Sequence, residues 1–252
     1  MKFRIIRRII YLKRARHRRG HGIHSPFLFR LITEVVENKR KLPEYKIFKD
    51  LKENALNILE DAEPSLSAVY HQFNLPPANP HRLYRKVELP LRYAKVVFRL
   101  LREFKPFSVI NYGPTLGANL ALMATANKES LVYQYINDAA YEQISNDLLK
   151  YLTIPNVRFF NESSVPSDDP AFLIINYPYN PAVSHEVVQK RLDLQGDDDV
   201  MIIRGIHESK AMEAIWKETI ASESVRVSLD LFEIGIALFR KGLQKENFIQ
   251  RF

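Results

Sequence analysis

Cysteine is absent from the 252 residues of this chain. Its absence excludes disulfides, thiol catalysis and Cys-ligated zinc, and it fits a reducing compartment without proving one. No run of about 18 apolar residues occurs either, so we expect no membrane-spanning helix. The hydrophobic fraction of 46% is ordinary for a globular protein, and the length suits one large domain or a domain with an extension.

Acidic residues are missing from the first 33 positions, although ten of the 37 Lys and Arg residues lie there. The other 27 basic residues share the remaining sequence with all 29 Asp and Glu residues. The formal net charge of +8 therefore comes from the N-terminal segment. Because the rest of the chain is close to neutral, an extended nucleic-acid track along it is not expected.

The basic segment has the pattern of an amphipathic helix. At about 100° per residue, one side of this helix carries Phe3, Ile5, Ile6, Ile9, Ile10 and Leu12. The other side carries Arg4, Arg7, Arg8, Arg14 and Arg18. Three interpretations of residues 1–19 stay open. The helix docks its apolar side on the body and leaves its arginines in solvent, or it lies on an anionic membrane, or it contacts nucleic-acid phosphates.

The segment also bears on targeting, because basic N-termini occur in signal and transit peptides. Arginines interrupt any apolar core and no small-residue cleavage site follows, so a cleavable signal is not expected. An organelle transit peptide stays open. We expect a cytoplasmic protein, and the arm would allow peripheral contact with the inner membrane surface.

Helical spacing dominates the first third of the chain. Ser25 and Pro26 suit the N-cap and first position of a helix. Helices are expected over 25–38, 43–62 and 90–104, with a proline-rich surface connection over 74–84. We therefore divide the chain into a basic arm with a helical extension, residues 1–89, and an α/β domain, residues 90–252.

Strand-length apolar runs then alternate with helical segments. The expected strands are 107–112, 131–136, 157–160, 171–176, 199–204, 225–231 and 235–241. The expected helices are 116–126, 138–151, 181–192 and 208–221. Only three residues separate the last two strands, so they form an antiparallel hairpin. The fold class is α/β, with a mainly parallel seven-stranded sheet covered on both faces.

Three stretches carry a resemblance to a known family. They are "GHGIHSPFLFRLITEVV" near the N-terminus, "INYGPTLGANLALMA" after the first strand, and "IHESKAMEAIW...VSLDLFEIGIALFRKG" near the C-terminus. With the order of elements over 90–242, they resemble class I S-adenosylmethionine-dependent methyltransferases, in particular methyltransferase-like proteins of a Bacteroidetes type. The resemblance covers nearly the whole chain and implies a Rossmann-like fold and S-adenosylmethionine as cofactor.

In this family the cofactor lies over the carboxyl ends of the first strands. The resemblance assigns Gly113, Thr115 and Gly117 to the cofactor loop. It also implies acids two residues before the first glycine, at the end of the second strand and at the end of the fourth. This chain has Asn111, Asn137 and Asn176 at those places, with Asp138 as the other candidate for the ribose.

Each Asn removes a negative charge from the expected cofactor site. Asn still accepts a hydrogen bond, but it loses the charge-assisted part, which makes such bonds about twice as strong. The site is therefore degenerate in its acids. Either it binds the cofactor weakly, or it no longer binds it. A strand-end Asn also commonly bonds the backbone of its own loop.

The word "NYPY" at the end of the fourth strand is similar to the N-P-P-Y word of amino-group methyltransferases. That resemblance implies that Asn176 and the Tyr177 carbonyl accept hydrogen bonds from a substrate amine and that Tyr179 stacks on the substrate. The first proline of the word is missing, so the match is imperfect. An amino-group or nucleic-acid methyltransferase is therefore an alternative function.

Cation-dependent relatives have acids where this chain has Asn176 and Arg204, and Mg²⁺ requires oxygen ligands, so we expect no metal. His17, His21 and His24 lie close in sequence, but no fourth ligand is evident. The alternative role of His21 and His24 is to fix the start of the next helix by backbone hydrogen bonds. His207 follows the fifth strand and is a candidate general base, or a loop histidine paired with a carboxylate.

Two functions from different classes remain beside the amino-group alternative. One is a class I methyltransferase acting on an unidentified substrate, with positioning as the main catalytic effect. The other is a catalytically inactive methyltransferase-fold protein that serves as a binding or scaffold module. Four tyrosines at strands could line a pocket for adenine or an aromatic substrate: Tyr112, Tyr133, Tyr135 and Tyr177.

Overall fold

A computed structural model describes residues 2–15, 23–61, 67–73, 75–76, 79–135, 139–161, 172–178, 180–193 and 196–252. The chain forms two compact units. Unit 1 comprises Met1–Asn38, Val109–Tyr112 and Asp169–Phe252. Unit 2 comprises Lys39–Ser108 and Gly113–Asp168. No helix within the described ranges is long and apolar enough to cross a membrane.

Eight strands are assigned to one mixed sheet in the order β3-β2-β1-β4-β5-β7-β6-β8. They are β1 (Ser108–Tyr112), β2 (Leu131–Tyr135), β3 (Val157–Phe160), β4 (Phe172–Ile175), β5 (Val200–Arg204), β6 (Val227–Asp230), β7 (Ile234–Leu238) and β8 (Glu246–Ile249). The alternating runs and the terminal hairpin are confirmed. The expected number of seven strands is wrong, because β8 adds an eighth, parallel to β6.

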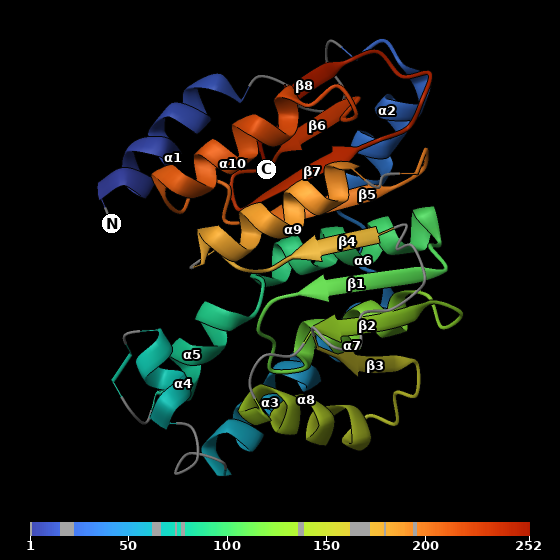
Figure 1. Cartoon of the computed structure of the whole chain (residues 1–252). Coiled ribbons are helices and arrows are strands. Elements are labelled where there is room, and N and C mark those ends of the chain that lie inside the picture. Colours follow the sequence, from blue (N-terminus) through green and yellow to red (C-terminus); the bar gives the residue numbers. More distant parts are fainter. Residues whose placement is uncertain are drawn as a thin grey trace. The chain divides into compact units, whose positions relative to one another are not determined.

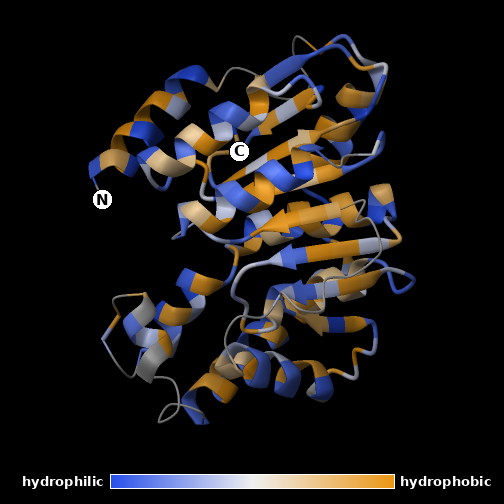
Figure 2. Ribbon diagram, viewed as in Figure 1, coloured by the Kyte–Doolittle hydropathy of each residue, from blue (hydrophilic) through white to orange (hydrophobic). Residues whose placement is uncertain are grey.

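In unit 1, β1, β4 and β5 pair in parallel, and β7 joins β5 and β6 in antiparallel pairs. Every residue of β4 and β5 is buried, and Figure 2 shows β4 as strongly hydrophobic. Such continuous apolar runs belong to strands covered on both faces. Trp216 packs on β7, since a Cβ added to Gly235 would lie 2.6 Å from its ring.

The helices of unit 1 are α1 (Lys2–Arg14), α2 (Pro26–Arg30), α9 (Pro181–Asp193) and α10 (Lys210–Ala221), with a π-helix, η1 (Leu31–Val36), after α2. The Ser25 hydroxyl accepts a hydrogen bond from the Leu28 amide, which confirms the expected N-cap. The predicted single helix over 25–38 is instead a short α-helix that continues as the π-helix. Figure 1 shows α1 lying beside α10.

In unit 2, β2 and β3 pair in parallel. Its helices are η2 (Pro43–Lys46), α3 (Ile47–Asp61), α4 (Ser67–Gln72), α5 (Pro80–Val87), α6 (Leu91–Phe104), α7 (Ala118–Ala126) and α8 (Ala139–Tyr151). Part of the segment predicted as a proline-rich connection is helix α5, which starts where Asn79 caps the Arg82 amide. The unit's core joins several of these helices and includes Leu59, Leu83, Leu116 and Ile144.

Candidate cofactor loop and strand-end cluster

The loop between β1 and α7 turns on two glycines in left-handed backbone conformations. Gly113 has a φ of 129° and Gly117 a φ of 92°, values that favour glycine. Gly117 also lies against α8, because an added Cβ would lie 3.1 Å from Leu148 Cδ2 and 3.2 Å from Ser145 Cα. The turn expected from the sequence is therefore present. Close helix packing is one physical reason for Gly117.

A buried carboxylate, Glu88, holds this loop in shape. Its Oε1 accepts hydrogen bonds from Thr115 Oγ1 at 3.1 Å and from the Leu116 amide at 2.7 Å. Its Oε2 accepts from the Asn119 amide at 3.0 Å. Only 1% of Glu88 is exposed. Because Glu88 accepts hydrogen bonds from the loop and from the first turn of α7, it holds the loop backbone in this conformation.

Sequence reasoning missed Glu88, which lies 25 residues before Gly113 and belongs to no recognised motif. Thr115, by contrast, was assigned to the loop, and its hydroxyl also accepts from the Gly117 amide at 3.0 Å. The acid expected at position 111 is absent from the sequence. A different carboxylate thus supplies negative charge to the loop.

Two further side chains of unit 2 bind the loop backbone. Gln134 Nε2 donates to the Gly113 carbonyl at 2.8 Å, and Ser145 Oγ donates to the Thr115 carbonyl at 3.2 Å. Both side chains are buried. They tie the loop to β2 and α8. A single polar residue in an apolar strand was the available signal for Gln134.

A pocket of unit 2 opens beside this loop. It is a small, partly open depression, and its walls are Pro114, Thr115, Gln134, Tyr135, Tyr141, Glu142, Ser145 and Phe159. Flat rings and hydroxyl, amide and carboxylate groups together suit a ligand that has both an aromatic base and a sugar. Groups of these kinds line sites that bind an aromatic base and a sugar. Tyr135 is one of the four tyrosines considered from the sequence. Asn137 and Asp138 lie outside the described residues.

A second polar cluster lies at the strand ends of unit 1. The backbone amide of Asn176 donates to the backbone carbonyl of Tyr112 at 2.6 Å. The side-chain oxygen of Asn176, Oδ1, accepts from Arg204 Nη1 at 2.8 Å. Arg204 Nε lies 3.7 Å from Glu233 Oε1, and all these side chains are buried. Asn111 is buried in β1, in register with Ile174 of β4. The cluster thus joins Asn176 to a buried ion pair.

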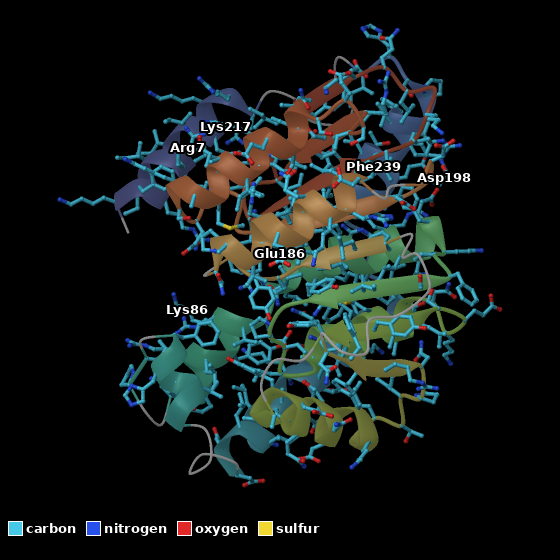
Figure 3. The ribbon with its side chains drawn as sticks, viewed as in Figure 1. Arg7, Lys86, Glu186, Asp198, Lys217 and Phe239 are labelled. Atoms are coloured by element: carbon cyan, nitrogen blue, oxygen red, sulfur yellow. The ribbon has the colours of Figure 1, made fainter. Side chains whose placement is uncertain are left out.

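Helix α1 extends the strand-end cluster. Arg4 binds Glu208 and Glu233 at 2.5 Å each, and Arg7 Nε lies 2.6 Å from Glu213 Oε2. Figure 3 labels Arg7 together with Lys217, whose Nζ binds the other oxygen of Glu213 at 2.8 Å. Arg4 and Arg7 of α1 therefore face the body. The interpretation in which they stay in solvent is wrong, because acids from distant segments converge on them.

His207 is buried and paired with a carboxylate. Its Nε2 lies 2.8 Å from Asp230 Oδ2, and its Nδ1 lies 4.0 Å from Glu213. Asp230 Oδ1 also accepts from the Phe232 amide. The carboxylate partner foreseen for a loop histidine is thus present, although it is Asp230 rather than a neighbour in sequence. The role of His207 as a general base stays a prediction.

The acceptors of the "NYPY" word already have partners. The Tyr177 carbonyl accepts from Ser184 Oγ at 2.9 Å and from the Asn180 amide at 3.1 Å. Asn176 Oδ1 accepts from Arg204. These bonds compete with a substrate amine for the same oxygens, which weakens the case for amino-group methylation. Tyr179 lies outside the described residues, as do His17 and His21.

Tyr112 ends β1 and is half-buried. Burial raises the pKa of its phenol, while Lys190 opposes this shift and Glu186 adds to it. Tyr112 therefore stays a neutral donor at physiological pH. Among the described side chains, no group of three or more His, Asp and Glu is placed to hold a metal ion. The guanidinium of Arg204 beside Asn176 would also repel a cation there.

No protein-family model and no curated protein matches this chain. Solved structures do match it. The S-adenosylhomocysteine-bound methyltransferase PaMTH1 of Podospora anserina has a TM-score of 0.57 at 8% identity, covering 87% of this chain and 98% of its own. The O-methyltransferase TomG of Streptomyces achromogenes, in complex with S-adenosylmethionine, has a TM-score of 0.54 at 13% identity, with coverage of 74% and 89%.

An O-methyltransferase of Bacillus cereus in complex with S-adenosylhomocysteine has a TM-score of 0.52 at 12% identity, covering 73% of this chain and 99% of its own. Identities this low establish a common fold and not a common activity. The chain has the α/β Rossmann-like fold of the class I S-adenosylmethionine-dependent methyltransferases.

Proposed function

We propose that this chain is a class I S-adenosylmethionine-dependent methyltransferase that acts on an unidentified substrate. The observation that carries the proposal is the loop from Gly113 to Gly117, held in shape by Glu88 beside a small depression lined by aromatic rings and polar groups. A loop whose shape is fixed by hydrogen bonds within the protein reduces the entropic cost of binding. The shared fold with structures that contain this cofactor or its product supports the same site.

The residues of unit 2 have separate tasks in this proposal. Tyr135 and Phe159 would flank the base, Thr115 and Gln134 would line the sugar side, and the buried charge of Glu88 would favour a cationic ligand. When bound, the cofactor supplies an activated methyl group. The chain's contribution is to hold and orient the two reactants, which alone can lower a barrier substantially. Neutral Asn111, Asn137 and Asn176 imply weaker cofactor binding than acids would give.

Thermal unfolding with and without S-adenosylmethionine or S-adenosylhomocysteine tests this proposal. At about 100-fold excess over Kd, one site stabilises the protein by about 2.7 kcal/mol. At roughly 2–4 °C per kcal/mol for a chain of this size, the unfolding temperature should rise by about 5–10 °C. Phe159→Ala should reduce the shift, because it removes one wall of the pocket. No shift at millimolar ligand would overturn the proposal.

Asn137→Asp provides a sharper test of the assignment at the second strand. The family resemblance places a ribose-binding acid there, so restoring a carboxylate should tighten S-adenosylmethionine binding by about tenfold, or about 1.4 kcal/mol. Calorimetric titration of both variants gives the two dissociation constants. An unchanged Kd would mean that Asn137 does not contact the ribose.

A catalytically inactive binding or scaffold protein is the second candidate. The bonds that occupy Asn176 Oδ1 and the Tyr177 carbonyl favour it, since they use acceptors at the strand ends where a substrate would react. This candidate predicts no release of S-adenosylhomocysteine from the purified protein with any substrate fraction, even if the cofactor binds. Sustained release that depends on a substrate fraction would exclude it.

A further inference from the structure

Helix α1 is amphipathic, but it presents its apolar side to solvent. The exposed fractions are 54% for Ile5, 56% for Ile6, 51% for Ile9 and 43% for Leu12. Ile5, Ile9 and Leu12 follow one another at intervals of four and three residues, so they form one stripe along the helix. We call the side chains of Ile5, Ile6, Ile9 and Leu12 the isoleucine ridge. Large exposed apolar side chains that gather on one surface mark an interaction site.

The opposite side of α1 fixes the helix to unit 1. Arg4 and Arg7 bind three carboxylates there, and Arg8 stacks over the Phe232 ring at 4.5 Å. Tyr11 is buried, donates its hydroxyl to the Gln250 carbonyl and packs against Phe232 with ring centroids 5.2 Å apart. The orientation of the helix is therefore set by ion pairs and aromatic contacts. The isoleucine ridge lies on the exposed side of α1, which takes no part in these contacts.

Charges around the ridge select the kind of partner. Lys2 and Lys13, at the two ends of the helix, are exposed, as is Arg14. No acid occurs among the first 33 residues. The exposed side of α1 thus combines a central apolar stripe with cations at both ends. A surface with anionic groups above an apolar interior complements that arrangement.

We infer that the isoleucine ridge docks α1 onto an anionic lipid surface, parallel to the membrane plane. The ridge would enter the boundary between headgroups and acyl chains, with Lys2 and Lys13 at the level of the anionic headgroups. This inference does not depend on the proposed methyltransferase activity. It places the basic segment on a membrane surface, with the apolar side of α1 in contact with the lipid.

Two other occupants fit the described contacts less well. Nucleic-acid phosphates would complement the exposed Lys2, Lys13 and Arg14 but would leave the isoleucine ridge without an apolar partner. Arg4, Arg7 and Arg8 are already engaged by acids and rings of unit 1. A second copy of the chain would bring Lys2 beside Lys13 in an antiparallel pair, or like residues together in a parallel pair. Both arrangements place equal charges side by side without a compensating acid.

Flotation with lipid vesicles tests the inference on the full-length protein. The probe is a phosphatidylcholine vesicle with phosphatidylglycerol as the minority lipid, compared with phosphatidylcholine alone. We expect wild type to float with the anionic vesicles. The double variant Ile5→Gln/Ile9→Gln should bind about tenfold or more weakly, because it removes the central part of the ridge. Leu91→Gln is the matched control, since Leu91 is 50% exposed and lies in unit 2.

Two single-residue variants test the charge at the helix ends. Lys2→Gln and Lys13→Gln should each weaken binding to anionic vesicles by about fivefold, the equivalent of about 1 kcal/mol for each cation near such a surface. Added salt should reduce wild-type binding in the same direction. Both lysines are exposed, so each variant should keep its fold and the test stays informative.

The inference is overturned if wild type does not float, or if the isoleucine variant floats as well as wild type. It is also overturned if sedimentation in the absence of lipid shows a dimer that the isoleucine variant dissociates, because a second copy would then occupy the ridge. Binding to RNA or DNA without vesicle binding would assign the segment to nucleic acid. Equal loss in Leu91→Gln would mean that the effect is not specific to α1.

Discussion

At the scale of single residues, Glu88 is the side chain on which the cofactor loop depends. Glu88→Gln removes a buried charge and turns an amide group toward backbone donors, which leaves hydrogen-bonding groups unmatched. The expected loss is about 1–3 kcal/mol in the free energy of unfolding. At roughly 2–4 °C per kcal/mol, the unfolding temperature should fall by roughly 2–12 °C. Differential scanning calorimetry measures this change.

Glu44→Gln is the control for Glu88, because Glu44 forms a surface pair with Arg102 in the same unit. Both partners of that pair are more than 40% exposed, so its loss should cost less than about 1 kcal/mol. An unfolding temperature of Glu88→Gln equal to that of wild type would show that the loop keeps its shape without the carboxylate.

Ionisation of Tyr84 makes the free energy of unfolding depend on pH in the alkaline range. Burial raises the pKa of its phenol well above the ordinary value of 10.0, and the charge of Glu88 adds to the shift. Above pH 10 the unfolded chain loses this proton while the folded chain keeps it, so the free energy of unfolding falls as the pH rises. Below pH 10 the contribution is fully present.

In Tyr84→Phe the free energy of unfolding should therefore decrease less steeply above pH 10 than in wild type. Its pH dependence near neutral pH should be unchanged. Denaturant titrations of wild type and variant between neutral and alkaline pH give the comparison. Equal slopes for the two proteins would mean that Tyr84 ionises as readily in the folded state as in the unfolded state.

At the scale of elements, α1 shows what an amphipathic pattern can and cannot predict. The pattern identified the helix and its two sides. It could not show which side faces the protein, because the three acids that bind Arg4 and Arg7 lie more than 200 positions later. Apolar burial is the common driving force for helix docking, so the opposite orientation was a reasonable expectation.

The orientation of α1 predicts that replacing an arginine of this helix destabilises the protein more than replacing an isoleucine. In most docked amphipathic helices the apolar side chains matter more. Arg7→Met should lower the free energy of unfolding by about 1–3 kcal/mol, because it removes the guanidinium beside the buried Glu213 and leaves an exposed lysine and the more distant His207. Ile9→Gln should change it by less than about 0.5 kcal/mol, since that side chain is half-exposed and Gln favours helices. Chemical denaturation of both variants measures the two values.

The opposite result, with Ile9→Gln costly and Arg7→Met neutral, would mean that the apolar side of α1 docks on the body. The lipid inference would then lose its basis. The two substitutions lie on one helix, two positions apart, so they share any effect of helix fraying.

Strands and helices with continuous apolar patterns were predicted within a few residues, as in β4 and β5. The elements that were missed have little pattern of their own. β8 is four residues long and only one of its side chains is buried, so its pairing depends on β6 more than on its sequence. α5 follows prolines that normally mark loops, although Asn79 and Pro80 are a good N-terminal signal.

The same limit applied to the candidate site. The glycine turn was predictable because left-handed backbone conformations need glycine, and Gly113 and Gly117 both adopt them. Glu88 was not predictable, because its contacts with the loop depend on how α5 and α6 pack in unit 2. The partners of Asn176 and His207 likewise come from β5 and β6, which are distant in sequence.

At the scale of the whole molecule, the two proposals concern different units. The cofactor loop and its pocket belong to unit 2, whereas α1 and its acidic partners belong to unit 1. The two ligands should therefore protect different segments from hydrogen exchange. S-adenosylhomocysteine should slow exchange over 113–117 and in the first turns of α8, where the pocket walls lie.

Anionic vesicles should instead slow exchange in α1, because lipid excludes water from the side of the helix that carries the isoleucine ridge. Exchange measured by mass spectrometry on the full-length protein, with each ligand and with both, resolves the two patterns. Protection by S-adenosylhomocysteine that falls only on unit 1 would contradict the site at Gly113. Protection by vesicles over 113–117 but not α1 would mean that lipid enters the pocket, and the ridge would then need another partner.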